Sequence, residues 1–175
     1  MICCASNSDC DDHDPCTVDS CGADGSCAHT AVSCWRITGR AVGTATVPST
    51  GRSVQRSERL DGLLILNEDG TYRIPAGNCP GTGESLPDEI GSTRPGRRGR
   101  LVLAASNLPE QADALSQCIG HRVRLKNEQT WVRILADGDH LRGMSTVHAN
   151  ARASGLTINL VITERFRGLR TDPAP

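Results

Sequence analysis

The stretch Trp35-Arg36-Ile37-Thr38-Gly39-Arg40-Ala41 alternates strictly, with apolar or small side chains at the odd positions and polar ones at the even positions. Successive side chains of a β-strand point to opposite faces of the sheet, so this alternation is typical of a strand with one buried face. The stretch predicts that the chain after residue 34 is built on a half-buried β-sheet.

The same alternation recurs downstream, between turn signals. Residues 60–67 and 71–74 flank Glu68-Asp69-Gly70, and residues 131–135 and 140–147 flank Asp137-Gly138. An Asp-Gly pair supplies the positive φ that tight hairpins need. Further strands are expected at residues 100–105, 121–125 and 156–163. About eight strands predict an antiparallel β-barrel or β-sandwich over residues 35–168, followed by a polar tail at 169–175.

One segment has a helical pattern instead. Asn107 precedes Pro109 and Glu110, residues favoured in a first helical turn, and Gly120 is typical of a helix C-terminus. Apolar side chains follow one another at three- and four-residue steps: Leu108, Ala112, Leu115 and Ile119. The body of the protein is therefore expected to be mostly β, with one short amphipathic helix.

A glycine- and proline-rich stretch, residues 75–99, reads as a long loop, and loops of that length are usually tied down, functional or disordered. It contains Cys79, and the other cysteine of the body is Cys118. We therefore predict a Cys79–Cys118 disulfide that pins the loop to the end of the helix. Such a loop across the open end of a barrel is a place for the mouth of a small-molecule site, an arrangement that loosely resembles the lipocalin or calycin barrels. Trp35 and Trp131 are expected to anchor the core.

Seven of the nine cysteines fall within the first 34 residues, where few apolar side chains are available for a core. Cross-links are the expected source of order, through disulfides at Cys4, Cys10, Cys16, Cys21, Cys27 and Cys34. Zinc is the alternative, with His13 and His29 as further ligands, but the gaps between the cysteines are longer than those of zinc knuckles. Disulfides predict an oxidising compartment: extracellular, cell-surface or periplasmic.

Three signatures in this cysteine-rich module, residues 1–34, occur in order: Cys10-Asp11-Asp12, Cys16-Thr17-Val18-Asp19-Ser20-Cys21, and Gly25-Ser26-Cys27-Ala28-His29-Thr30. Together they resemble one unit of the Dictyostelium-type CTDC repeat, over about residues 4–34. His13 stands where that family commonly has glycine. The resemblance implies a disulfide-bonded extracellular spacer or adhesion module that carries no catalytic residues.

Two features of the N-terminus lead us to expect that the protein begins further upstream. Cys3 is left without a partner, and we expect that it paired with an upstream unit or is a free thiol. The first residues also lack the basic segment, apolar run and cleavage site of an export signal. We therefore expect the beginning of the protein to be missing.

The aspartates of the module also suggest calcium. Asn7, Asp9, Asp11 and Asp19 offer oxygens at alternate positions, although the glycine and glutamate of an EF-hand loop are absent from the matching places. An acidic, turn-rich surface is the competing interpretation. Apart from this calcium set, no cofactor is expected.

Charge is divided unevenly along the chain. Six aspartates and no lysine or arginine give residues 1–34 a charge of −6. Because the net charge of the whole chain is −1, residues 35–175 carry +5. The basic cluster at Arg94, Arg97, Arg98 and Arg100 has no aromatic neighbour, which favours a solvated loop over a nucleic-acid site. No apolar stretch reaches the length of a membrane span.

Candidate catalytic groups in the body are few. His121, His140 and His148 are its histidines, and no nucleophile or metal motif accompanies them. We expect Glu164, together with Arg165 and Arg167, to lie in a solvated terminal strand. We therefore expect no enzyme and no catalytic residue.

Three functions remain open at this stage. The first is a secreted or surface-exposed, non-enzymatic protein with a structural or interaction role and an extracellular protein or matrix partner. The second is a barrel that binds a small apolar ligand beneath the 75–99 loop. The third, an enzyme, needs the three histidines to converge with a carboxylate.

Overall fold

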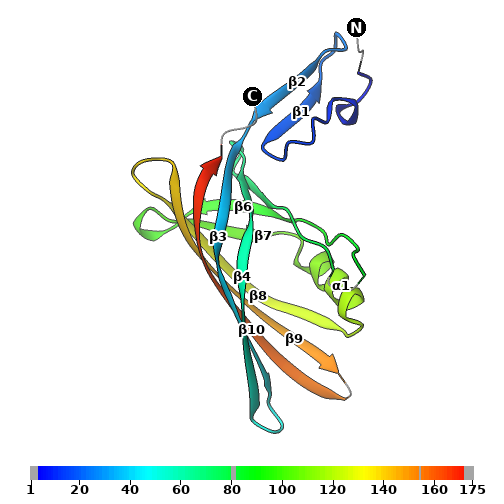
Figure 1. Ribbon diagram of the computed structural model, residues 1–175, viewed down its shortest axis with the longest axis vertical. Coiled ribbons are helices and arrows are strands. Elements are labelled where there is room, and N and C mark those ends of the chain that lie inside the picture. The colour runs from blue at the N-terminus through cyan, green and yellow to red at the C-terminus, as the bar shows by residue number, and fades with distance from the viewer. Residues whose placement is uncertain (1–3, 80–81, 154, 172–175) are drawn as a thin grey trace.

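The computed structural model describes residues 4–79, 82–153 and 155–171. Its main part is a closed antiparallel barrel with the strand order β10-β3-β4-β5-β6-β7-β8-β9, and a two-stranded sheet of β1 and β2 is attached to it (Figure 1). Each barrel strand pairs with its neighbour along the chain, and β10 closes the ring by pairing with β3. Of the two predicted architectures, the chain forms the barrel.

The elements of the module are η1 (Asn7–Cys10), β1 (Thr17–Cys21) and β2 (Cys27–Ala31). The barrel consists of β3 (Ser33–Val47), β4 (Arg52–Leu66), β5 (Thr71–Ile74), β6 (Glu89–Pro95), η2 (Arg97–Gly99), β7 (Leu101–Ala105), α1 (Leu108–Ile119), β8 (Val123–Ile134), β9 (His140–Ala153) and β10 (Leu156–Thr171). The two hairpins β3–β4 and β9–β10 are much longer than predicted and run past the other strands at the end opposite the module (Figure 1).

Three sequence predictions about strands were wrong. The strands expected at 121–125 and 131–135 are parts of one strand, β8 (Val123–Ile134), whose register shifts between Leu125 and Asn127. The expected loop at 75–99 contains a barrel strand, β6, and a short 3-10 turn, η2. Finally, β10 continues to Thr171, so that residues 169–171 of the expected tail lie in the sheet, while 172–175 lie outside the described residues.

The helix α1 follows the prediction closely. Asn107 precedes its first residue, Pro109 lies in the first turn, and Gly120 ends it with a φ of 67°, in the left-handed region that favours glycine. The hydroxyl of Ser116 accepts a hydrogen bond from the backbone N–H of Val123 at 2.8 Å. This bond ties the helix end to the first residue of β8.

The hydrophobic core fills the part of the barrel nearer the module. It contains nine buried residues, namely Trp35, Ile37, Leu64, Leu66, Tyr72, Leu103, Val132, Leu141 and Phe166. Trp35 anchors this core as predicted, but Trp131 does not: it is half-buried on the outer wall, where the guanidinium of Arg100 lies 4.0 Å from its ring centroid. The two tryptophans differ because they lie on opposite faces of the sheet.

The module attaches to the barrel through a small contact of its own. Cys16, bonded to Cys34 at the start of β3, packs against Ile65 of β4. Arg73 of β5 donates a hydrogen bond to the carbonyl of Pro15 at 3.3 Å. Every residue of β2 is exposed, so the module contributes little core, as its composition predicts.

Within the described residues, none of the helices has the length and apolar character that a transmembrane helix needs.

Candidate ligand-binding site in the barrel interior

A cavity of about 260 Å³ lies inside the barrel. Most of its wall is apolar, formed by Ile37, Leu60, Leu64, Ile74, Leu103, Leu115, Leu125, Val132, Val147, Ile162 and Phe166. The polar part of the wall consists of Glu89, Gln111, Glu128, Thr130, Ser145 and Glu164. Three carboxyl groups thus face one small, mainly apolar space.

The alternation of the strands turns these glutamates inward. On β10, Glu164 lies two residues from both Ile162 and Phe166, and on β8, Glu128 lies two residues from Thr130. Residues two apart on a strand share a face of the sheet. Each glutamate therefore occupies a core position of its strand, and the prediction that Glu164 is solvated was wrong.

Glu89 is the most constrained of the three acids. Its Oε1 accepts a hydrogen bond from the hydroxyl of Tyr72 at 2.6 Å, and its carboxyl hydrogen-bonds to that of Glu128, which requires a proton between the two. Burial and, to a smaller extent, the nearby Glu128 raise the pKa of Glu89 to about 7, with the Tyr72 hydroxyl opposing the change. The pair holds a proton near neutral pH.

The other two carboxyls are raised by the same physical cause. Burial raises the pKa of Glu128, against hydrogen bonds from Thr130 at 3.1 Å and from Glu89. Burial also raises the pKa of Glu164, and the charge of Glu128 adds to it. Among the described residues that line the cavity there is no lysine or arginine to balance these acids. The interior of the barrel therefore favours protonated carboxyl groups or a positively charged ligand.

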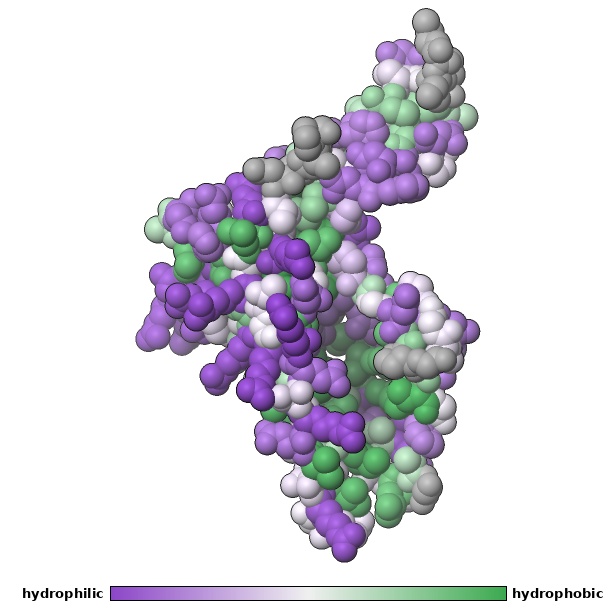
Figure 2. Space-filling model, viewed as in Figure 1, coloured by the Kyte–Doolittle hydropathy of each residue, from purple (hydrophilic) through white to green (hydrophobic). Residues whose placement is uncertain are grey.

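A second, smaller hollow of about 180 Å³ adjoins the cavity. It lies between α1 and the segment before β6, lined by Ala76, Leu86 and Pro87, and it shares Ile74, Glu89, Gln111 and Leu115 with the interior. Figure 2 shows a hollow edged by hydrophobic residues beside the lobe that carries α1. We call this hollow the mouth of the cavity, and residues of the 75–99 segment form part of its wall.

The mouth is held by a cross-link. Cys79 and Cys118 form the disulfide that the sequence predicts, with their Cα atoms 5.7 Å apart. The backbone N–H of Cys79 donates to the carbonyl of Glu84 at 2.7 Å, and that of Leu86 to Gly77 at 3.1 Å. The segment over the mouth is thus folded on itself and bonded to the last turn of α1.

The three histidines do not meet. His121 is exposed just before β8, and His140 and His148 are exposed on the outer face of β9. His140 is paired only with the neighbouring Asp137, at 2.8 Å between Nδ1 and Oδ2. The requirement set for the enzyme hypothesis, convergence of these histidines with a carboxylate in one cleft, is not met.

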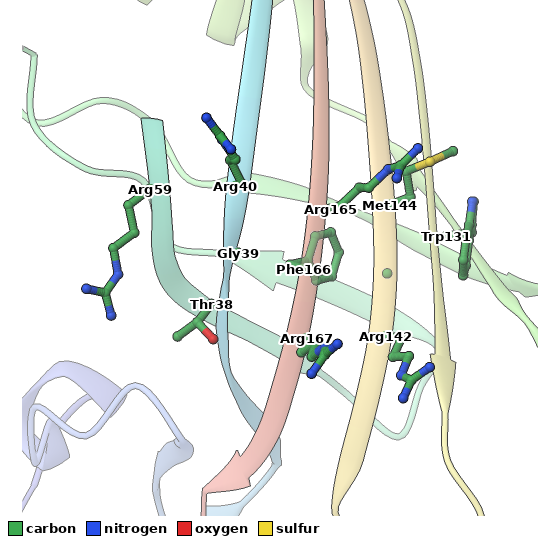
Figure 3. Close-up of a pocket in the computed structure, with 11 residues that line it drawn as sticks. Thr38, Gly39, Arg40, Arg59, Trp131, Arg142, Met144, Arg165, Phe166 and Arg167 are labelled. Carbon is green, nitrogen blue, oxygen red and sulfur yellow. The ribbon is translucent and has the colours of Figure 1, made fainter. Parts of the chain in front are cut away.

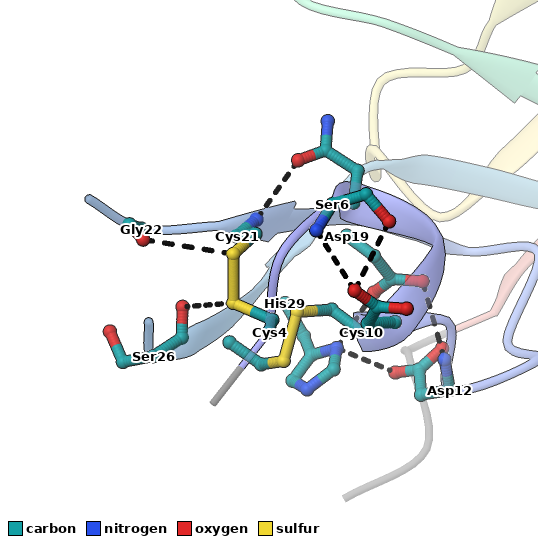
Figure 4. The surroundings of a disulfide bond; sticks show 12 residues. Cys4, Ser6, Cys10, Asp12, Asp19, Cys21, Gly22, Ser26 and His29 are labelled. Atoms are coloured by element: carbon teal, nitrogen blue, oxygen red, sulfur yellow. Dashed lines mark hydrogen bonds and ion pairs between the residues drawn. A yellow bond between two sulfur atoms is a disulfide. The ribbon is translucent and has the colours of Figure 1, made fainter. Parts of the chain in front are cut away.

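In the module the six predicted cysteines pair as Cys4–Cys21, Cys10–Cys27 and Cys16–Cys34. Figure 4 shows the first of these beside the acidic turn. Sulfurs in disulfides are not thiolates and do not ligate zinc, so the zinc alternative is not what this chain forms. Cys3 lies outside the described residues.

The four predicted calcium ligands are engaged separately. Asp9 accepts hydrogen bonds from the backbone N–H groups of Ala5 and Ser6, Asp11 from that of His13, and the Asn7 side chain from that of Cys21. Asp19 instead lies with Asp12 and His29, and its Oδ1 is 2.7 Å from the Nδ1 of His29 (Figure 4). These bonds are local contacts of the kind that aspartates make in turns, and calcium binding by this set stays a prediction.

Sequence reasoning missed Glu89, Glu128 and Glu164 as a group, although a signal for one of them was present. The face predicted from Leu156, Ile158, Leu160 and Ile162 continues by the same two-residue step to Glu164 and then to Phe166. An acid between two large apolar residues of the same parity marks a buried carboxyl.

The comparisons with known proteins concern two different parts of the chain. Residues 9–32 match the family model of the CTDC repeat, described as the Dictyostelium (slime mold) repeat. This match confirms the resemblance stated for the module, and it covers only that segment. A comparison with curated proteins finds no match.

Two solved structures match over much of the length of this chain. A protein of unknown function from Bacteroides ovatus has a TM-score of 0.34 at 10% identity, over 86% of this chain and 50% of that one. The ywiB protein from Bacillus subtilis has a TM-score of 0.30 at 10% identity, over 75% of this chain and 92% of that one. The chain spans half the length of the first, and scores this low assign no function.

Proposed function

We propose that this chain is a non-enzymatic extracellular binding protein whose barrel takes a small ligand with an apolar body and one positively charged amino group. The main support for this proposal is that three carboxyl groups face an apolar cavity whose described lining residues include no lysine or arginine. The sequence led us to expect a purely apolar ligand, and these carboxyls lead us to propose an amphipathic cation instead.

The physical argument rests on the energy of a buried charge. An ionised carboxylate in apolar surroundings is strongly unfavourable unless it is paired, so these acids stay partly protonated in the empty cavity. An ammonium group placed between Glu128 and Glu164 would supply the missing charge, and the aliphatic walls would contact the rest of the ligand. The 260 Å³ volume suits a ligand with a short alkyl or single-ring body.

The module supports the compartment in this proposal. Four disulfides among the described residues are compatible with an oxidising environment, and the CTDC match supports a spacer or attachment role for residues 9–32. In this scheme the module places the barrel in an extracellular assembly, and the barrel holds the ligand.

Isothermal titration calorimetry with n-hexylamine, n-hexanol and hexanoate, three probes of one chain length and different charge, tests the proposal. At pH 7.5 the amine is expected to bind about tenfold more tightly than the alcohol, because a charge-assisted hydrogen bond is stronger than a neutral one. Binding of the amine is also expected to release protons, so that its heat differs between phosphate and Tris buffers.

Variants locate the binding. Glu128→Gln and Glu164→Gln keep the shape of the side chain and remove the charge, so each is expected to lose the preference for the amine. Glu68→Gln, in the exposed β4–β5 turn, is the matched control and is expected to bind as the wild type does. Equal binding of amine and hexanoate, or no saturable binding of any probe, contradicts the proposal.

A further inference from the structure

The outer wall of the barrel carries a second, separate feature: a hollow lined by arginines. A groove of about 670 Å³ runs across β4, β3, β10, β9 and β8 at the level of Gly39, Gly143 and Phe166. Its walls carry Arg40, Arg59, Arg142, Arg165 and Arg167, and Figure 3 shows these side chains coming from adjacent strands around a common space. All five are exposed.

These arginines face one another directly. Arg40 on β3 is opposite Arg59 on β4 and also opposite Arg165 on β10. Arg142 on β9 is opposite Arg167 on β10. Like charges directly opposite on neighbouring strands destabilise a sheet. The barrel therefore keeps three unfavourable pairs side by side on one surface.

The pKa of Asp61 is lowered mainly by Arg36 and to a smaller extent by Arg59, so one described acid partly balances the charge of the group. None of the five arginines forms an ion pair with a described residue, whereas Arg36 just outside the groove pairs with Asp61 at 3.2 Å. Arg40 donates to the hydroxyl of Ser57 at 2.7 and 2.9 Å, which fixes the side chain without balancing its charge. A concave surface of unpaired positive charge attracts an anion.

The groove also shows which anion fits. A single-stranded nucleic acid needs aromatic faces on which its bases stack, but the ring of Trp131 in this groove has Arg100 over its face at 4.0 Å, and Phe166 is buried. A hollow also meets a flat membrane surface only along its rim. A flexible chain with several sulfate groups can follow the groove and give each guanidinium a planar, two-point contact.

We propose that this outer groove binds a sulfated polysaccharide through Arg40, Arg59, Arg142, Arg165 and Arg167. The oxidising compartment indicated by the disulfides is one in which such polymers occur as partners. The five arginines point away from the interior cavity, because outward and inward side chains alternate along the same strands, and Phe166 lines both spaces.

Heparin is the probe, and the wild type is compared with the triple variant Arg40→Gln/Arg165→Gln/Arg167→Gln by surface plasmon resonance. The variant is expected to bind heparin about a hundredfold more weakly. The slope of log affinity against log salt concentration is expected to be smaller by about two, because three fewer contacts release fewer counterions. Its thermal stability is expected to equal or exceed that of the wild type, because like-charge pairs are removed.

The matched control removes three charges elsewhere. Arg122→Gln/Arg124→Gln/Arg152→Gln changes exposed arginines near the β8 start and the β9 end and is expected to bind heparin within about threefold of the wild type. An equal loss in both variants, or no binding of heparin by the wild type, overturns the proposal. A twenty-residue oligo-dT or phosphatidylserine vesicles binding more tightly than heparin at equal salt would assign the groove to a different partner.

Discussion

The hydroxyl of Tyr72 on β5 donates to Oε1 of Glu89 on β6 at 2.6 Å, and a glycine makes this contact possible. Gly91 lies directly opposite Tyr72, and a Cβ at Gly91 would come within 2.7 Å of the tyrosine ring and 2.1 Å of the carbonyl oxygen of Ala104. The ring lies over this glycine, and its hydroxyl reaches the acid two residues earlier. A buried acid is thereby held in one orientation toward the cavity.

Protein stability is expected to fall as the pH rises from about 5 to 8. The pKa of Glu89 is raised from 4.5 to about 7 in the folded state, so between these values the folded chain binds more protons than the unfolded chain, and ionisation removes up to about 3 kcal/mol of stability. Glu128 and Glu164 act in the same direction. Chemical denaturation with intact disulfides at pH 5 and pH 8 measures the difference.

Glu89→Gln is expected to flatten this pH dependence and to be more stable than the wild type at pH 8 by about 1–3 kcal/mol, because a neutral amide replaces a buried charge. Glu68→Gln at the exposed turn keeps the wild-type profile. A Glu89→Gln profile parallel to that of the wild type would show that Glu89 ionises normally.

Tyr72→Phe removes the donor and leaves the ring in place. The variant is expected to lose about 1–2 kcal/mol at pH 8, where the acid is ionised, and less at pH 5. Because the tyrosine hydroxyl lowers the pKa of Glu89, the midpoint of the pH dependence is expected to move upward. Unfolding curves over a pH series test both effects, and an unchanged midpoint would contradict the role given to this bond.

Removing the Cys79–Cys118 cross-link is expected to destabilise the barrel. A disulfide between residues 39 positions apart contributes about 4 kcal/mol by its effect on the unfolded chain. The double variant Cys79→Ala/Cys118→Ala avoids a free thiol, and mass spectrometry with and without reduction checks that the three module disulfides remain. Hexylamine binding is expected to weaken as well, since the mouth loses its fixed edge.

Two glycine variants separate close packing from backbone effects. A Cβ at Gly39 would lie 2.1 Å from the carbonyl oxygen of Arg165, whereas a Cβ at Gly77 would meet nothing within 4 Å. Gly39→Ala is expected to destabilise the protein by about 2–3 kcal/mol and Gly77→Ala by less than about 0.5 kcal/mol. Similar melting temperatures for the two variants would mean that β3 and β10 can move apart with little loss of stability.

Features with a local origin could be predicted from the sequence. Alternation around Trp35 and the Asp-Gly turns located β-strands, and the pattern from Asn107 to Gly120 located the helix almost to the residue. The Cys79–Cys118 pair followed by elimination. His13 also has a local explanation: its φ of 60° is in the left-handed region, where the CTDC family commonly has the glycine that this region favours.

Features that depend on pairing partners were missed. The first half of β4 is exposed and, apart from Val54, polar, so it shows no alternation, and it is a strand because it pairs with β3 along its whole length. Likewise β6, with Gly91 and Pro95 in it, has weak strand propensity and is held between β5 and β7. The meeting of Glu89, Glu128 and Glu164 required three non-adjacent strands to face one cavity, which no local pattern contains.

The pairing order of the module cysteines has a consequence for proteolysis. The bonds Cys4–Cys21, Cys10–Cys27 and Cys16–Cys34 overlap along the chain. A protease that cuts once anywhere between Cys10 and Cys27 therefore leaves the two fragments joined by at least two covalent links. The exposed turns of this segment can therefore be cut once without release of either fragment.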